Sequence, residues 1–278
     1  MKNILKIMLM MITIFTIAGS AVYAAEIPVS DQDQLITSSD WTEISNLQDE
    51  MKKEEPDATI DYDKALKVYV DCNLIKLQTA DTKKLTSALE SANYVWVIPF
   101  KMEKTYGMFT VAKGLPLSEE AKSVLTKAEQ EEVKNHAGKW MITETAEHTV
   151  EPYYDTLLEK REALSDCTRV VLVGSQPGMR QPVALGMDDE TARIWISLGY
   201  QYPVMEKIPE TQNVESGVYS FESVAEISDT YIEDSEVSTG AGVQSRSSMK
   251  YVAGIGIVLI GSILILSVLK KKKMKSED

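Results

Sequence analysis

The strongest constraint on this chain is an uncharged run near its C-terminal end. Residues 251–269 read YVAGIGIVLIGSILILSVL, and the lysine-rich tail 270–278 follows directly. A helix over this run is long enough to cross the roughly 30 Å hydrocarbon layer of a bilayer. Positive charge beside a span stays on the cytoplasmic side. The sequence therefore predicts one transmembrane helix, a cytoplasmic tail, and everything before Tyr251 outside the cytoplasm.

The N-terminal end has the pattern of a secretory signal peptide. Lys2 and Lys6 precede the apolar stretch 7–17, and Val22-Tyr23-Ala24 fits the small-x-small rule for cleavage. We expect residues 1–24 to be removed; the alternative is a retained second span. A signal followed by one span predicts a single-pass protein of a bacterial-type cell membrane, with its N-terminal domain outside.

The charge of the outer part limits its partners. The chain has 29 Lys+Arg against 42 Asp+Glu. Eight basic and two acidic residues flank the apolar ends, which leaves 21 basic and 40 acidic residues in 26–249, a formal charge of −19. Nucleic acids and anionic lipid headgroups bind through Lys and Arg, so this surface repels both. The expected partners are the bilayer, through 251–269, and a protein at the cell surface.

Periodicity divides the outer part into a folded domain over 25–225 and a flexible stalk over 226–250. The stalk is rich in Ser, Thr, Gly, Asp and Glu and poor in large apolar groups. In the domain, capping residues and apolar spacing predict helices over 40–54, 81–93, 118–138 and 149–164. Alternation predicts strands over 64–71, 94–100, 106–113, 139–145, 168–173, 181–187, 191–197 and 217–222.

Three details of this pattern can be tested against a structure. Asp40 and Glu43 are placed to form a capping box at the first helix. In the helix over 118–138, the spacing directs Val124 inward. Pro99 lies within the strand 94–100 and cannot donate to a ladder, which favours an edge or a bulge there.

The mixed order of elements and their short connections predict an α+β fold. We expect a mostly antiparallel sheet with packed helices, in a single ectodomain carried by one transmembrane helix. Two topologies fit. Residues 64–145 follow the β-α-β-β-α-β order of a split βαβ unit. Residues 94–197 give two strands, helices and three strands, an order that resembles extracytoplasmic sensor domains of the PAS or Cache type.

The motifs that suggest chemistry fail on spacing, so we predict no catalytic residue, metal or cofactor. Gly174-Ser175-Gln176-Pro177-Gly178 is neither G-x-S-x-G nor a phosphate loop, and a Pro-Gly turn explains it. His136 and His148 lack the helical spacing of zinc peptidases. The aspartates of 57–63 supply too few oxygens for calcium. Residues 236–240 keep only the Thr-Gly of the wall-sorting motif L-P-x-T-G, so a permanent membrane anchor is expected.

Two pairs of residues are candidates for a site. Tyr200 and Tyr202 lie outside any clear element, where aromatic side chains often mark a ligand-binding surface. Cys72 ends one predicted strand and Cys167 directly precedes another. If these strands are neighbours and antiparallel, the two cysteines can form a disulfide in the oxidising outer compartment. The alternative is that both are buried as free thiols.

These observations favour a membrane-anchored extracytoplasmic binding or interaction module. Two alternatives stay open. The nine residues of the tail 270–278 cannot hold an output domain, so a sensing role requires a ligand-sensing accessory subunit of a membrane complex. The third is an extracytoplasmic hydrolase whose residues are too scattered to form a recognisable motif.

Overall fold

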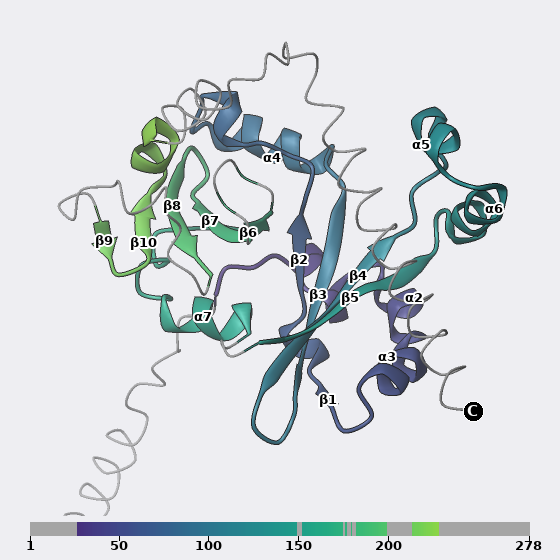
Figure 1. Ribbon diagram of the computed structural model, residues 1–278. Helices are drawn as coiled ribbons and strands as arrows, with labels where there is room; N and C mark the ends of the chain where they lie inside the picture. The colour runs from purple at the N-terminus through teal and green to yellow at the C-terminus, as the bar shows by residue number, and fades with distance from the viewer. Residues whose placement is uncertain are drawn as a thin grey trace, which may run out of the picture.

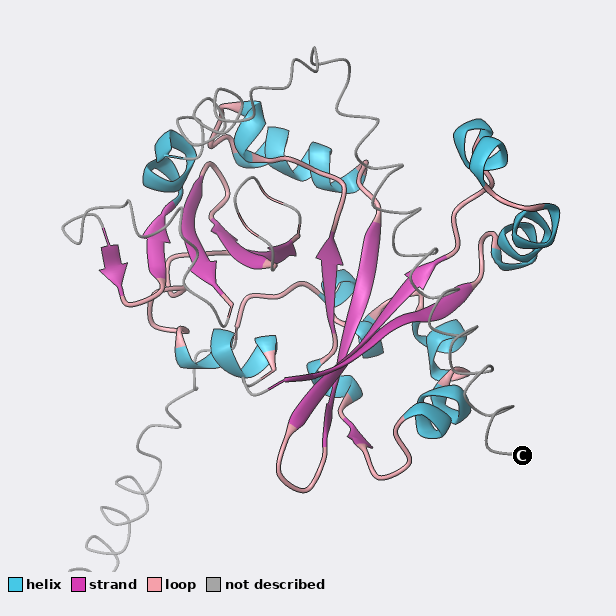
Figure 2. Ribbon diagram, viewed as in Figure 1, coloured by secondary structure: helices cyan, strands magenta, loops and turns pink. Residues whose placement is uncertain are grey.

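The computed structural model describes residues 27–148, 152–174, 176, 179, 182–198 and 213–227. In these residues the chain forms a ten-stranded, strongly twisted sheet with short helices around it (Figures 1 and 2). Every pairing between these strands is antiparallel except that of β2 with β6. The predicted α+β class with a mostly antiparallel sheet is confirmed.

The strands are β1 (Thr59–Ile60), β2 (Leu66–Tyr69), β3 (Tyr94–Lys101), β4 (Tyr106–Lys113), β5 (Trp140–His148), β6 (Arg169–Val173), β7 (Val183–Met187), β8 (Ala192–Ser197), β9 (Asn213–Glu215) and β10 (Val218–Ser220). The helices are α2 (Trp41–Ser45), α3 (Gln48–Glu54), α4 (Thr82–Glu90), α5 (Glu119–Val124), α6 (Lys127–His136) and α7 (Tyr153–Glu159). Residues 221–227 are also helical, and short 3-10 helices occupy Asp31–Asp33, Leu35–Thr37, Tyr62–Lys64 and Ile75–Leu77.

The sheet consists of two antiparallel halves joined by one parallel pairing. The strand order is β5-β4-β3-β2-β6-β7-β8-β10-β9, and β1 pairs with β3. Only two register pairs join the halves, Val68 with Leu172 and Tyr69 with Val173. Figure 1 shows β2–β5 on one side of this junction and β6–β10 on the other. Of the two topologies considered, the split βαβ unit over 64–145 is wrong, because β2, β3, β4 and β5 are sequential antiparallel neighbours and α4 connects two of them.

Pro99 lies in an interior strand and not at an edge. The pairing of β2 with β3 ends at Leu66 and Val97, and the pairing of β1 with β3 begins at Phe100. Pro99 falls in the interval between the two partner strands, and its carbonyl accepts a 2.9 Å hydrogen bond from the Asp61 N–H. The missing proline N–H therefore interrupts no ladder.

Three apolar clusters hold the helices to the sheet. The first packs α4 and the helical residues 221–227 against the second half of the sheet, and its fully buried side chains include Leu85, Val183, Leu185 and Trp195. The second lies on the other face beneath α7 and includes Val68, Leu157, Val170 and Leu172. The third packs α2 and α3 against β3, β4 and β5 and includes Ile44, Met51, Trp96 and Phe109.

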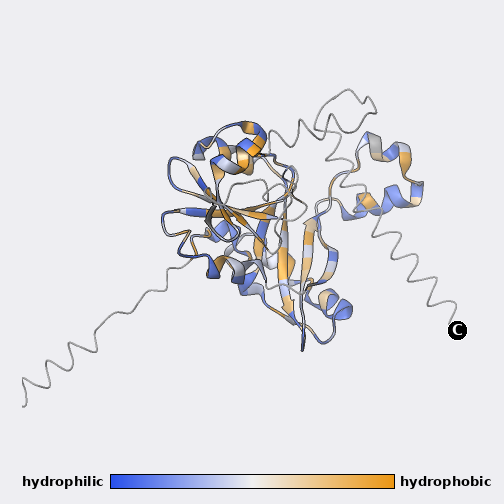
Figure 3. Cartoon of the chain, turned by 60° about the vertical axis from the view of Figure 1, so that its left-hand side comes forward, coloured by the Kyte–Doolittle hydropathy of each residue, from blue (hydrophilic) through white to orange (hydrophobic). Residues whose placement is uncertain are grey.

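The predicted helix over 118–138 is two helices that project from the sheet. We call residues 114–138, between β4 and β5, the arm. Figure 3 shows it standing apart from the sheet, with hydrophilic and hydrophobic residues interspersed along its helices. The first helix, α5, ends at Val124, and Thr126 starts the second helix, α6, because its hydroxyl and Glu129 form a reciprocal capping box. Val124, expected to point inward, is 67% exposed. Among the arm side chains whose burial is described, only Ala121 is buried.

The membrane predictions lie outside the described residues. These predictions concern residues 1–24, the stalk beyond residue 227, the run 251–269 and the tail. Within the described part of the chain, every helix is too short or too polar to serve as a membrane span.

Candidate functional site

The N-terminal segment fills the space where the two halves of the sheet separate. We call residues 27–37 the wedge. The pairing of β2 with β6 covers Val68 and Tyr69 of β2. Two residues earlier, at Leu66 of β2 and Val170 of β6, the two strands are not paired with each other. Instead, Val29 forms a parallel bridge with Val170 of β6, and Gln34 forms an antiparallel bridge with Leu66 of β2. One short segment thus completes the backbone pairing of both halves.

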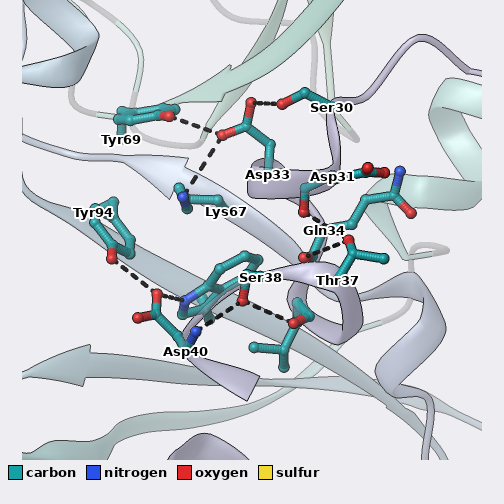
Figure 4. A network of polar contacts seen from close by, with 12 residues as sticks. Ser30, Asp31, Asp33, Gln34, Thr37, Ser38, Asp40, Lys67, Tyr69 and Tyr94 are labelled. Carbon is teal, nitrogen blue, oxygen red and sulfur yellow. Dashed lines mark hydrogen bonds and ion pairs between the residues drawn. The ribbon is translucent and has the colours of Figure 1, made fainter. Parts of the chain in front are cut away.

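Asp33 is the polar centre of the wedge. Its side chain is 2% exposed. Its Oδ2 accepts hydrogen bonds from the Ser30 hydroxyl at 2.6 Å and from the Arg169 guanidinium at 3.0 Å. Its Oδ1 accepts from the Tyr69 hydroxyl at 2.8 Å (Figure 4). Since Tyr69 is on β2 and Arg169 on β6, a single carboxylate ties the wedge to both halves of the sheet.

Lys67 lies beside this carboxylate within a cluster of aromatic rings. Its ammonium is 3.9 Å from Asp33 Oδ1, and it stands 4.5 Å from the ring centroid of Tyr94, 5.2 Å from that of Trp96 and 6.0 Å from that of Tyr69. An ammonium over aromatic rings gains cation–π attraction, most where water is excluded. Only 11% of the side chain is exposed. Burial lowers the pKa of Lys67, and the Asp33 carboxylate opposes that shift.

Asp40 extends the network and does not form the predicted capping box. Its Oδ2 accepts hydrogen bonds from the Tyr94 hydroxyl at 2.8 Å and from Trp96 Nε1 at 3.0 Å (Figure 4). It makes no side-chain cap at α2, and Glu43 is exposed. The reason is competition for one carboxylate. The half-buried Tyr94 and the fully buried Trp96 on β3 would lose their acceptor, whereas the first backbone N–H groups of a surface helix can bond to water.

The network is built to hold the wedge in place. Burial raises the pKa of Tyr69 and of Tyr94, with the neighbouring carboxylates adding to the shift. Both phenols therefore stay protonated and donate at neutral pH. The three donors to the Asp33 carboxylate come from the wedge itself (Ser30), from β2 (Tyr69) and from β6 (Arg169). This arrangement pairs the buried Asp33 carboxylate with three donors and fixes the junction of the sheet, a role in positioning and stability.

Sequence reasoning missed this network. In the sequence, Asp31 and Asp33 are neighbouring acids in a polar N-terminal stretch, and Lys67 alternates with apolar residues in a predicted strand. The one signal in the sequence was Lys67, a charged residue between the apolar Leu66 and Val68. Its importance becomes clear only in the structure, where the strand is buried on both faces.

The predicted site residues are not brought together. Tyr200 and Tyr202 lie outside the described residues. Cys72 and Cys167 are both free thiols, so the disulfide alternative is corrected. Their strands are neighbours, as that alternative required, but run parallel. Cys72 follows the C-terminal end of β2 and Cys167 precedes the N-terminal end of β6, which places the two residues at opposite ends of the junction.

Gln176, which lies within the motif 174–178, has a structural role. This side chain is 3% exposed. Its Nε2 donates to the carbonyls of Cys72 at 2.6 Å and Gly174 at 3.0 Å, and its Oε1 accepts from the Leu74 N–H at 3.1 Å. In the described part of the chain, no three His, Cys, Asp or Glu side chains are grouped so as to hold a metal ion.

Comparisons with known proteins give no relative for this chain. No protein-family model matches it, no curated protein matches its sequence, and no solved structure matches its fold. The resemblance of 94–197 to PAS or Cache sensor domains therefore stays a prediction from element order.

Proposed function

We propose that this chain is a membrane-anchored interaction module that presents a protein-binding surface outside the cytoplasm. The anchor and its direction are supported by the uncharged run 251–269 and the lysines after it, and export is supported by the signal pattern of 1–24. The observation that carries the proposal within the folded part is the arm.

The arm is well formed yet contributes little to the core. Val124 is 67% and Leu115 43% exposed, the first being the most exposed large apolar side chain in the described residues. Short isolated helices are marginal in water, and tertiary packing normally stabilises them. Here local caps do so instead, with Ser118 accepting from the Ala121 N–H at 3.1 Å and Thr126 forming the capping box. Exposed apolar groups on a projecting, locally capped element are typical of a surface that contacts another molecule.

Charge indicates the kind of partner. The arm has five glutamates and three lysines in residues 114–138, and the whole outer part is strongly acidic. A helix that lies on a membrane normally presents Lys and Arg to anionic headgroups. A folded protein with an apolar patch and a neutral or basic rim is a better match for this surface.

Site-specific photo-crosslinking tests the proposal. A photoreactive residue replaces Val124 in the full chain, expressed in its native cell, and the matched control replaces Leu77, an apolar side chain 44% exposed that lies outside the arm. We expect one discrete adduct from position 124 and none from position 77. Equal labelling at both positions, or none at 124, would contradict the proposal.

A further inference from the structure

A second surface, independent of the arm, is the outer edge of the sheet at β5. In the described part of the chain, β5 pairs with β4 on one side, and its other side has no partner strand. The strand runs from Trp140 to His148, and its side chains from 141 to 147 are half-buried or exposed apart from Ile142. Unpaired edge strands present a row of N–H and C=O groups that can template pairing with another strand.

The hydrogen bonds of the neighbouring hairpin identify which groups of β5 point outward. The Met102 N–H donates to the Thr105 carbonyl at 2.9 Å, and successive bonded pairs in an antiparallel ladder lie two residues apart. Gly107 therefore faces β3, while Met108 and Thr110 face β5. Their partners on β5, Ala146 and Glu144, face inward. The residues between and after them, Thr145 and Glu147, direct their N–H and C=O groups outward.

A bulge changes the alternation in the middle of β5. The Gly114 N–H donates to the Lys139 carbonyl at 2.9 Å, so Trp140 and Ile142 direct their backbone groups outward. The register then shifts between Thr110 and Val111, which leaves Thr143 as the extra residue of β5; its hydroxyl donates to the Thr110 carbonyl at 3.1 Å. The outward-facing set is therefore 140, 142, 145 and 147.

The four outward-facing residues of one β5 can pair with the same four residues of a second copy that runs antiparallel to it. If two copies of β5 are placed antiparallel, Trp140 of one lies opposite Glu147 of the other, and Ile142 lies opposite Thr145. All four outward-facing residues then meet outward-facing residues, and the two bulges lie together at the two-fold axis. An interface of this kind uses the same patch on both subunits. A strand without the bulge would have a different set of outward-facing residues.

The charges along β5 have the same symmetry. Lys139 is exposed at the N-terminal end, and Lys113 lies 5.4 Å from the ring centroid of Trp140. Glu147 is exposed toward the other end, where the Glu54 carboxylate accepts a hydrogen bond from the Thr145 hydroxyl. Antiparallel pairing of two copies places the basic end of each strand beside the acidic end of the other, whereas parallel pairing places like charges together.

We propose that β5 of one chain pairs antiparallel with β5 of a second copy, extending the sheet across a two-fold axis. Bulges and charges also protect edges against unspecific pairing. At β5 the bulge and the charges at the two ends of the strand match those of a second copy in this one antiparallel register.

Disulfide trapping tests the register. Between the two outward pairs, Met141 of one copy lies opposite Ala146 of the other, in the closely spaced pair whose α-carbons are about 4.5 Å apart, within the range of a disulfide. We expect the full chain carrying Met141→Cys and Ala146→Cys, purified in detergent, to form a covalent dimer. The matched control, Met141→Cys with Glu144→Cys, is two residues out of register and should stay monomeric under the same oxidation.

A second measurement separates pairing from chance collision. Thr145→Pro removes an outward N–H without touching the ladder to β4, whereas Thr145→Val keeps that N–H. We expect wild type and Thr145→Val to sediment as dimers, and Thr145→Pro to sediment as a monomer with an unchanged near-UV spectrum. Equal trapping of the two cysteine pairs, or a wild-type chain that is monomeric at every concentration, would overturn the proposal. Neither result bears on crosslinking through the arm.

Discussion

Removal of the Asp33 carboxylate is the sharpest test of the network at the sheet junction. The Asp33→Ala change leaves three donors without their acceptor, on Ser30, Tyr69 and Arg169. A hydrogen bond to a charged group contributes about 1.5–3 kcal/mol, and breaking a buried ion pair from one side costs about 3–5 kcal/mol. These losses overlap, and the 18% exposure of the Arg169 side chain lets water replace part of what it loses. We therefore expect a loss of about 3 kcal/mol in the free energy of unfolding.

Urea unfolding of the full chain, followed by tryptophan fluorescence, measures this loss. The matched control is Asp31→Ala, which removes the same group from an exposed position of the same short 3-10 helix. It should change stability by less than about 0.5 kcal/mol. A stable domain has only about 5–15 kcal/mol in total, so the two variants should be easy to separate. Equal midpoints for the two variants would show that the wedge is not held by Asp33.

Three further predictions concern the junction, the arm and one thiol. Lys67→Met should cost about 1 kcal/mol and Arg169→Met about 3 kcal/mol in the same urea assay, because of these two cations Arg169 alone donates a hydrogen bond to the Asp33 carboxylate. The reverse order would contradict the geometry. Val124→Ser should leave the free energy of unfolding within about 0.5 kcal/mol of wild type, whereas Ile98→Ala, at a side chain 0% exposed, should lower it by about 2–5 kcal/mol. A comparable loss at position 124 would mean that the arm is packed against the domain. Burial raises the pKa of Cys167 to about 11 from the ordinary 9.0, so its thiolate population at pH 8, and hence its alkylation rate, should be about 100-fold below that of an unfolded cysteine. The folded pKa is the higher one, so this thiol's contribution to stability is fully present below pH 9 and is lost as the pH rises toward 11; equal alkylation with and without urea would refute the burial.

Local signals in the sequence predicted most elements correctly. The runs 94–100 and 106–113 form a hairpin in which β4 is in register with β3 from Tyr106 to Ala112. Asp81 caps α4 by accepting from the Lys84 N–H at 3.0 Å. The three predicted strands after residue 167 pair in sequence order as an antiparallel meander. In each case the deciding interaction joins residues close in sequence, so periodicity and capping chemistry were sufficient.

The failures have a different physical origin. Asp40 had a good local partner for a helix cap in Glu43. Its carboxylate instead accepts hydrogen bonds from Tyr94 and Trp96, which are 54 and 56 positions away in the sequence. Val124 had the right helical spacing for burial, but the sheet does not extend beneath the arm. Neither outcome is encoded in the neighbouring residues. The parallel orientation of β2 and β6, which removed the disulfide alternative, also depends on the complete path of the chain.

The wedge also sets a constraint on the order in which the chain acquires its structure. Asp33 and Arg169 are 136 positions apart, so at about 5–20 residues per second the arginine is synthesised roughly 7–30 s after the aspartate. During that interval β2 has no β6 beside it, so Val68 and Tyr69 lack their partners in the second half of the sheet. The wedge can already bond to β2 through Gln34 and Asp33, but its contacts with Val170 and Arg169 form only after β6 is made. A nascent chain stopped before residue 169 should have its hairpin and α4, but no closed junction.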